Sequence, residues 1–253
     1  MIVHSYRQSV RLDALVRETR EIVRGWDWAS GAFGHALSLP RYGDLHPWRR
    51  YSYENFPCTG VLARCHALRE VFDSFDCEKV SFRLLRRPPG SAYAWHTDAW
   101  KGPGVVRFQI PILSDAEAFL IITDYDRIDQ LRGGQPRHLD EASFAAFAGA
   151  NEGHFVRHYL SPGLLHYFDT TRVHTLVNAG RAERITLTFD LVANEWLRAR
   201  YPAIATEIGA GPAAPLPRPG ALRRGLLFAR SRLFPLRNRM RGWRTSTDAR
   251  PQS

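Results

Sequence analysis

The chain has 253 residues, of which 44% are hydrophobic, and this is enough for one large domain with a buried core. Its formal net charge of +10 belongs to the C-terminus, because residues 211–253 hold ten arginines and one acid while residues 1–210 are nearly neutral. We therefore expect no nucleic-acid partner for the body, and no membrane span or secretion signal, since no stretch approaches the roughly 20 apolar residues of a span.

Residues 1–78 are predicted to form a helical and irregular segment that packs on the rest of the domain. In residues 10–24, VRLDALVRETREIVR, apolar side chains recur at helical spacing with charges opposite, which predicts an amphipathic helix. Aromatic-rich irregular sequence follows to about residue 57. A second helix is predicted over residues 60–74.

Residues 79–192 change to short β-rich runs separated by turn signals such as PPG, KGPG, SPG and NAG. Many short strands separated by such turns predict a sandwich or barrel, so the expected fold class is mainly β with flanking helices. One insertion, about residues 126–152, contains the helix-like LDEASFAAFAGA and is too long for a simple hairpin. The predicted strands are KVSFRLLR, VVRFQIPIL, EAFLIITD, HFVRHYL, LLHYFDT, HTLVN and RITLTFDLV.

The chain after the β core divides into an extension of the core, residues 193–210, and a linker with a basic tail, residues 211–253. Within residues 221–244, apolar residues recur at steps of four and three, and eight arginines lie outside that stripe. This pattern is typical of a helix on an anionic membrane surface, although Pro235 would interrupt it. Two interpretations stay open beside it: docking on the protein's own domain or a partner chain, and nucleic-acid binding by a disordered tail.

The cysteine content indicates the compartment. Cys58, Cys65 and Cys77 form no CxxC pair and fit a reducing environment rather than a disulfide framework. We therefore expect a cytoplasmic protein, associated with a membrane only through its C-terminal tail.

The stretch SAYAWHTDAW, residues 91–100, carries two candidate metal ligands, His96 and Asp98. Residues two apart on an extended strand project from the same face, so both side chains can aim at one point. An imidazole and a carboxylate suit a divalent first-row metal, and one more histidine would complete the two-histidine, one-carboxylate triad of non-haem iron sites.

The second histidine is predicted to be His174, in FDTTRVHTLVNAGRAERITLTFDL. Only His174 is followed by a segment that supplies the rest of a site, because Arg184 begins a strand ten residues later. We expect that strand to form a hairpin across NAGRAE, which would return Arg184 to the neighbourhood of the His174 strand. The other histidines considered are His138, His154, His158 and His166.

Two predicted strands have one polar face. Arg107 and Gln109 alternate with apolar residues in VVRFQIPIL. A polar strand face usually meets water, but two such faces flanking both halves of a metal triad would line the interior of a barrel. A guanidinium and a hydroxyl there could hold a small anionic ligand. The polar face of the last strand consists of Arg184, Thr186, Thr188 and Asp190.

Other polar residues are given structural roles. HFVRH, residues 154–158, has the spacing of a zinc pair on a helix, but it reads as a strand and lacks the HExxH glutamate. His166 is predicted to be a core residue or a group that supports the site. RLLRRPPG, with Arg83, Arg86 and Arg87, is interpreted as a solvated loop.

At these motifs the sequence resembles a known family. HTD, the RFQIP run, FDTTRVHTLVN and RITLTFD look like the Fe(II)- and 2-oxoglutarate-dependent oxygenases of the aspartyl/asparaginyl β-hydroxylase type. The resemblance covers about residues 79–192 and implies a double-stranded β-helix, a jelly-roll barrel similar to cupins. It does not extend to the C-terminal tail.

The resemblance also implies a role for each site residue. His96, Asp98 and His174 would be the iron ligands, and Arg184 would pair with the distal carboxylate of 2-oxoglutarate. Arg107 would lie near the cosubstrate or the substrate.

Two further residues are assigned to cosubstrate binding, Gln109 and Thr186. Gln109 stands where some members have a histidine, and it could donate to a carboxylate but not titrate.

The presence of Asp98 favours hydroxylation over halogenation, since halogenating relatives leave that position open for halide. The insertion departs from the short pattern of the family core.

The implied reaction couples oxidative decarboxylation of 2-oxoglutarate at Fe(II), with O2, to hydroxylation of an unactivated C–H bond. The expected substrate is a small amino-acid-like molecule, a peptidyl side chain or a natural product. Two alternatives remain. One is a hydroxylase of a lipid-linked acyl substrate at the membrane surface, which only the tail supports. The other is a non-catalytic cupin-like binding module, which would have little need for both Asp98 and Arg184.

Overall fold

The computed structural model describes residues 3–7, 9–25, 29–31, 34–38, 65–98, 104–133 and 141–208. The start of the second predicted helix, residues 60–64, and the basic tail, residues 211–253, lie outside these ranges. Within them, no helix is long and apolar enough to span a membrane.

The helices predicted over residues 10–24 and in the insertion are confirmed, as are the predicted strands of the β core. Of the second predicted helix, residues 66–73 are helical. In chain order the elements are β1 (Val3–Tyr6), α1 (Leu12–Gly25), β2 (Ala29–Gly31), β3 (Gly34–Ser38), α2 (His66–Asp73), β4 (Lys79–Arg87), β5 (Ser91–Ala92), β6 (Val105–Leu113), β7 (Ala118–Thr123), η4 (Ile128–Gln130), α3 (Glu141–Ala150), β8 (Phe155–Tyr159), β9 (Leu165–Phe168), β10 (His174–Asn178), β11 (Arg184–Val192), α4 (Glu195–Arg200) and α5 (Pro202–Ile208).

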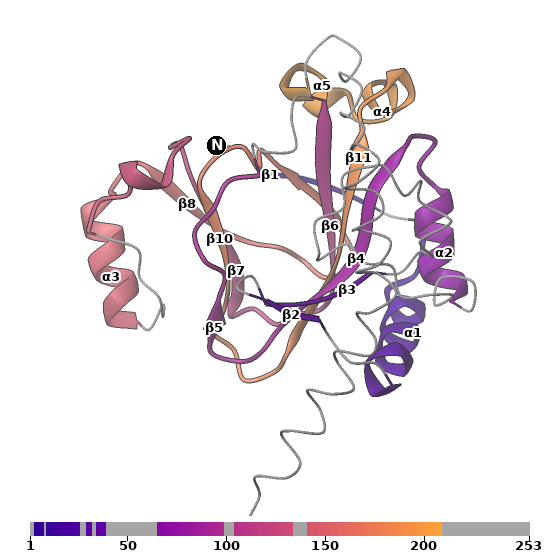
Figure 1. Cartoon of the computed structure of the whole chain (residues 1–253), viewed down its shortest axis with the longest axis horizontal. Coiled ribbons are helices and arrows are strands. Elements are labelled where there is room, and N and C mark those ends of the chain that lie inside the picture. The colour runs from indigo at the N-terminus through magenta and orange to yellow at the C-terminus, as the bar shows by residue number, and fades with distance from the viewer. Residues whose placement is uncertain are drawn as a thin grey trace, which may run out of the picture.

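The strands form two antiparallel sheets that face each other (Figure 1). The large sheet has the order β1-β9-β6-β11-β4-β3-β2, and the small sheet has the order β5-β10-β7-β8. From β4 onward the chain passes back and forth between the sheets, so that β4, β6, β9 and β11 lie in one and β5, β7, β8 and β10 in the other. This winding is a double-stranded β-helix, and the predicted jelly-roll fold class is confirmed.

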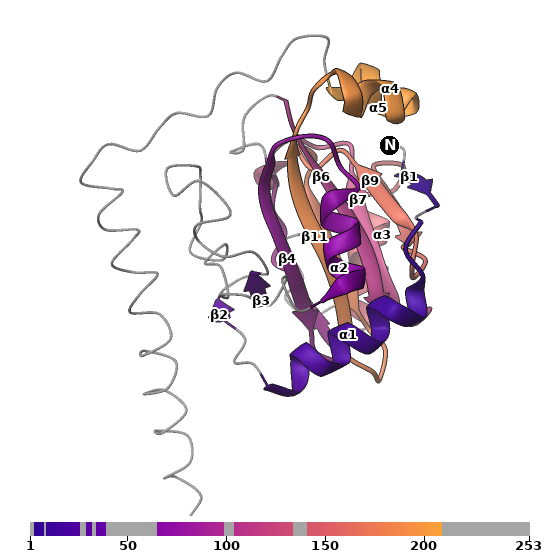
Figure 2. The same cartoon turned by 90° about the vertical axis from the view of Figure 1, so that its right-hand side faces the viewer.

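The large sheet has an apolar outer face and a polar inner face. Ile185, Leu187 and Phe189 of β11 belong to a core cluster with Leu15 of α1 and Leu68 of α2. The two helices cover this outer face (Figure 2). Because side chains alternate along a strand, the polar residues of β11 and β6 point the other way, toward the small sheet. The structure thus buries the two polar faces that the sequence predicted for a barrel interior.

The predicted hairpin between β10 and β11 is wrong. β10 pairs with β5 and β7, whereas β11 pairs with β4 and β6, so the two strands lie in different sheets. Both edges of each strand are occupied by other partners, which leaves no edge for a hairpin between them. The NAGRAE segment instead crosses from the small sheet to the large one, and Arg184 lies on the sheet opposite that of His174.

The insertion covers the outer face of the small sheet. Phe147 of α3 lies with its ring centroid 4.8 Å from that of Trp95 and 5.3 Å from that of Phe155 on β8. Phe119 and Val177 of the sheet join the same apolar cluster. This helix therefore buries the side of the small sheet that faces away from the barrel interior (Figure 1).

A side chain of α1 caps the start of α2. The backbone N–H groups of Ala67 and Leu68 donate to Oε1 and Oε2 of Glu18 at 2.8 and 3.0 Å. The N-cap residue of α2, Cys65, makes no capping bond with its side chain. Glu18 therefore satisfies two of the N–H groups that a helix leaves without internal partners, and its charge opposes the helix dipole.

Replacing Glu18 with alanine should lower the free energy of unfolding by about 1–2 kcal/mol, the usual cost of losing a helix cap. Glu18→Gln keeps one acceptor oxygen and should lower the free energy of unfolding by less. Urea unfolding of both variants, with the exposed Glu21→Ala on the same helix as the matched control, measures the effect. An equal loss in Glu18→Ala and Glu21→Ala would contradict a capping role.

Candidate metal centre

The structure brings together the three predicted metal ligands. One ligand atom each of His96, Asp98 and His174 lies within 4.8 Å of the others. The backbones of His96 and His174 exchange two hydrogen bonds, 3.1 and 3.0 Å long, in an isolated bridge after β5. The N–H of Asp98 donates to the carbonyl of Thr170 at 2.7 Å, so main-chain bonds fix the segment that carries two of the ligands.

The hydrogen bonds of the two histidines set their tautomers. Nδ1 of His96 lies 2.8 Å from the carbonyl of Ala94, and Nδ1 of His174 lies 2.8 Å from the carbonyl of Arg172. A carbonyl can only accept, so each Nδ1 carries a hydrogen, and in the neutral imidazole the lone pair is then on Nε2. Burial, together with His96, lowers the pKa of His174 to about 3. A neutral imidazole with a lone pair on Nε2 is the form that binds a metal.

The carboxylate of the triad is buried and hydrogen-bonded. Oδ2 of Asp98 accepts a hydrogen bond from Nη1 of Arg107 at 2.5 Å and lies 4.0 Å from Nε2 of His174. Burial alone would lower the pKa of Arg107, but Asp190 and Asp98 raise it overall, so the arginine is charged. Two imidazoles and one carboxylate suit a divalent first-row metal with open coordination positions.

Arg184 supplies a buried positive charge on the opposite sheet. It is 1% exposed, and its Nε and Nη2 have no hydrogen-bond partner among the described residues. Burial and the charge of Arg87, its neighbour in the strand register, lower the pKa of Arg184 to about 10, so it is still charged at neutral pH. Two adjacent donor nitrogens on one guanidinium match a carboxylate that binds through both oxygens.

No protein-family model matches the chain, and no curated protein matches its sequence. Solved structures match it at low identity. HygX from Streptomyces hygroscopicus, with nickel and 2-oxoglutarate bound, is 11% identical over 76% of this chain and 83% of its own, at a TM-score of 0.44. A Pseudomonas putida prolyl-4-hydroxylase is 12% identical over 76% and 92%, at 0.41. AviO1 from Streptomyces viridochromogenes Tue57 is 18% identical over 77% and 90%, at 0.41.

These TM-scores lie below 0.5. The jelly-roll architecture therefore rests on the strand order of this chain, and the ligands of the matched proteins say nothing by themselves about its own. The narrower resemblance to aspartyl/asparaginyl β-hydroxylases stays a prediction from the motifs.

Gln109 and Thr186 lie on the inner face between the triad and Arg184. Gln109 pairs in register with Thr188 of β11, and its Oε1 is buried without a partner among the described residues. Thr186 is 3% exposed and lies two residues from Arg184. Their part in cosubstrate binding stays a prediction. The guanidinium of Arg107 donates to the carboxylates of Asp98 and Asp190, and its predicted nearness to the cosubstrate or the substrate stays a prediction.

The interpretation of RLLRRPPG as a solvated loop is wrong for two of its arginines. Arg83 and Arg87 lie on β4, are 3% and 7% exposed, and share the inner face with Thr188 and Arg184, their register partners. Arg86 points away and forms a surface ion pair, 2.7 Å long, with Glu183. In the run RLLRR, residues 83–87, arginine and leucine do not alternate, so no local pattern could have placed Arg83 and Arg87 inside.

Two further inner-face residues, Asp190 and His166, were not predicted to bind the metal or the cosubstrate. Asp190 pairs with Arg107. Nε2 of His166 lies 2.9 Å from the carbonyl of Ser161 and its Nδ1 lies 2.9 Å from the hydroxyl of Ser5, so both nitrogens are engaged. His166 is therefore a structural group, as its predicted core or supporting role requires.

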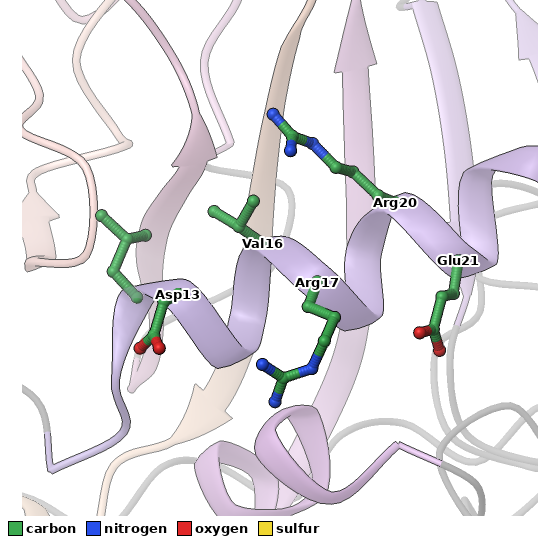
Figure 3. A pocket seen from close by; sticks show the side chains of 6 residues that line it. Asp13, Val16, Arg17, Arg20 and Glu21 are labelled. Atoms are coloured by element: carbon green, nitrogen blue, oxygen red, sulfur yellow. The ribbon is translucent and has the colours of Figure 1, made fainter.

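A surface hollow of about 660 Å³ follows α1 and is separate from the metal centre (Figure 3). Because α1 packs on the outer face of the large sheet, this hollow and the triad lie on opposite sides of that sheet. Its side chains carry charges of both signs and take no part in the triad. It is lined by Leu12, Asp13, Val16, Arg17, Arg20 and Glu21.

Proposed function

We propose that the protein is an Fe(II)- and 2-oxoglutarate-dependent dioxygenase that uses O2 to hydroxylate an unactivated C–H bond. The observation that carries this proposal is the placement of Arg184 on the sheet that faces the His96, Asp98 and His174 triad, with its Nε and Nη2 free of hydrogen-bond partners among the described residues. A metal triad alone fits many hydrolases, and a buried arginine alone fits many anion sites. Together they suit an oxo acid that reaches the metal at one end and Arg184 at the other.

The residues present fit this metal and cosubstrate. His96 and His174 would hold Fe(II) through Nε2, and Asp98 would supply the one negative charge of the set. When bound, Fe(II) would supply activation of O2 coupled to decarboxylation of 2-oxoglutarate to succinate and carbon dioxide. The chain itself positions the distal carboxylate at Arg184, orients the cosubstrate, and buries the charged groups away from water.

Gln109 and Thr186 are proposed to contact the cosubstrate between the metal and Arg184. Their burial and their position on the polar face support this assignment. The motifs around His96, His174 and Arg184 support membership of the aspartyl/asparaginyl β-hydroxylase type. The substrate would then be amino-acid-like, peptidyl or a natural product.

Succinate release by the iron-loaded full chain, screened over amino acids, peptides and natural-product scaffolds, tests the function. A substrate should raise succinate release in a manner that depends on both Fe(II) and 2-oxoglutarate. Succinate release that is equal with and without Fe(II) would contradict the proposal.

The peripheral membrane contact proposed for residues 221–244 has its own test. The full chain should pellet with anionic vesicles, and more strongly at low salt, because its arginines would be attracted to anionic lipid. A chain that ends at Ala210 should stay in the supernatant. Equal pelleting of both chains, or none by either, would contradict the membrane contact and remove the only support for a lipid-linked substrate.

A further inference from the structure

The guanidinium of Arg107 joins two buried carboxylates. Its Nε and Nη2 donate to Oδ1 and Oδ2 of Asp190 at 2.8 and 3.0 Å, and its Nη1 donates to Oδ2 of Asp98 at 2.5 Å. The three side chains are at most 6% exposed. Arg107 thus uses a two-bond fork on Asp190 and a separate N–H on the candidate metal ligand.

Asp190 is itself held in place. The hydroxyl of Ser81 donates to Oδ2 of Asp190 at 2.7 Å. Ser81 on β4 and Arg107 on β6 are the register partners of Asp190 on either side of β11. Three adjacent strands of the large sheet therefore present one connected row of polar groups, and this row reaches across the barrel interior to Asp98.

The charges in this row determine what Asp98 offers to a cation. A single arginine beside Asp98 would neutralise the carboxylate and repel a divalent metal at short range. Asp190 supplies a second negative charge, so the group of Arg107, Asp190 and Asp98 keeps an excess of one negative charge. Arg107 can then fix the orientation of the Asp98 carboxylate without cancelling the charge that a metal needs.

We propose that Asp190 is a positioning residue that, through Arg107, sets the metal affinity of the triad. This inference rests on the proposed metal site and goes beyond it, because it assigns the role of Arg107 to the metal ligand rather than to the cosubstrate. Asp190 itself would not contact metal or cosubstrate.

Binding of Co(II) to the full chain tests the inference without requiring turnover. The dissociation constant comes from titration, and the visible absorption of bound Co(II) reports its coordination. Asp190→Asn should weaken Co(II) binding about 10–100-fold, the usual effect of losing a partner of a metal ligand, and should change the spectrum. Asp13→Asn is the matched control, since Asp13 accepts the same two-bond fork from Arg11 on the exposed surface of α1.

A double variant separates this role from general damage to the core. In Asp190→Asn the charge of Arg107 is balanced by Asp98 alone, so the carboxylate that should bind the metal is neutralised. Adding Arg107→Gln removes that charge, so the double variant should bind Co(II) more tightly than Asp190→Asn alone. If Asp190 only packed in the core, the losses of Co(II) affinity from Asp190→Asn and from Arg107→Gln would add instead.

The outcomes separate the inference from the proposed function. A wild-type chain that binds no Co(II) would overturn both. A wild-type chain that binds Co(II), with an Asp190→Asn variant of unchanged affinity and spectrum, would overturn the inference alone. So would a double variant that binds Co(II) more weakly than Asp190→Asn. If Asp190→Asn does not fold, Ser81→Ala provides the test. We expect it to weaken Co(II) binding by less than about tenfold, because one hydrogen bond to Asp190 is missing, and an unchanged Co(II) affinity would overturn the inference.

Discussion

Replacing His174 with alanine is expected to abolish turnover and to weaken metal binding more than about 100-fold, beyond what the loss of a supporting partner costs. His174 supplies one of three protein ligands, and its neutral form makes no ion pair on which the fold depends. The backbone bonds between His174 and His96 do not involve the side chain and should persist. Co(II) titration, succinate release and thermal unfolding of the same variant measure the three effects.

The control for this variant is His154→Ala. His154 is a half-exposed histidine that pairs with Asp124 at 3.1 Å, and no part of the triad contacts it. The His154→Ala variant should bind Co(II) as tightly as the wild type does. Full substrate-dependent activity in His174→Ala would show that the triad does not hold the catalytic metal.

Replacing Arg184 with alanine is expected to weaken 2-oxoglutarate binding by about two to four decades. The distal carboxylate would be left buried without its guanidinium partner, which costs roughly 3–5 kcal/mol. Arg184→Lys should restore only part of the affinity, because a lysine keeps the charge but loses the two-bond fork. Calorimetric titration of the Fe(II)-loaded protein with 2-oxoglutarate, without O2, measures both.

Arg86→Ala is the matched control, since Arg86 lies on the neighbouring strand but points outward to Glu183. Its 2-oxoglutarate affinity should equal that of the wild type. Co(II) affinity should be unchanged in Arg184→Ala, because among the described residues no hydrogen bond or ion pair joins Arg184 to the triad. An unchanged 2-oxoglutarate affinity in Arg184→Ala would remove Arg184 from the cosubstrate site.

The features that could be predicted from the sequence are local in the chain. Alternation along β6 and β11 predicted both the strands and their polar faces, because side chains on a strand repeat every two residues. The spacing of His96 and Asp98 predicted that both side chains share one side. The metal triad needed only one distant residue, His174, and the motif around it was distinctive.

The features that could not be predicted depend on which strands pair. A hairpin was predicted for β10 and β11 because they are neighbours in sequence, but in a jelly roll the partners of β11 come from much earlier strands. Ser81 and Asp190 are 109 residues apart, so their hydrogen bond has no signal in the local sequence. The same holds for the fork between Arg107 and Asp190, and for the burial of Arg83, which only the pairing of β4 with β11 explains.

Binding of 2-oxoglutarate to the wild-type chain with and without Fe(II), in the absence of O2, tests the central claim most directly. If the cosubstrate spans the triad and Arg184, Fe(II) should strengthen 2-oxoglutarate binding at least about tenfold, and 2-oxoglutarate should strengthen Fe(II) binding by the same factor. Binding of 2-oxoglutarate that is equal with and without Fe(II), or no binding under either condition, would contradict a site shared by metal and cosubstrate.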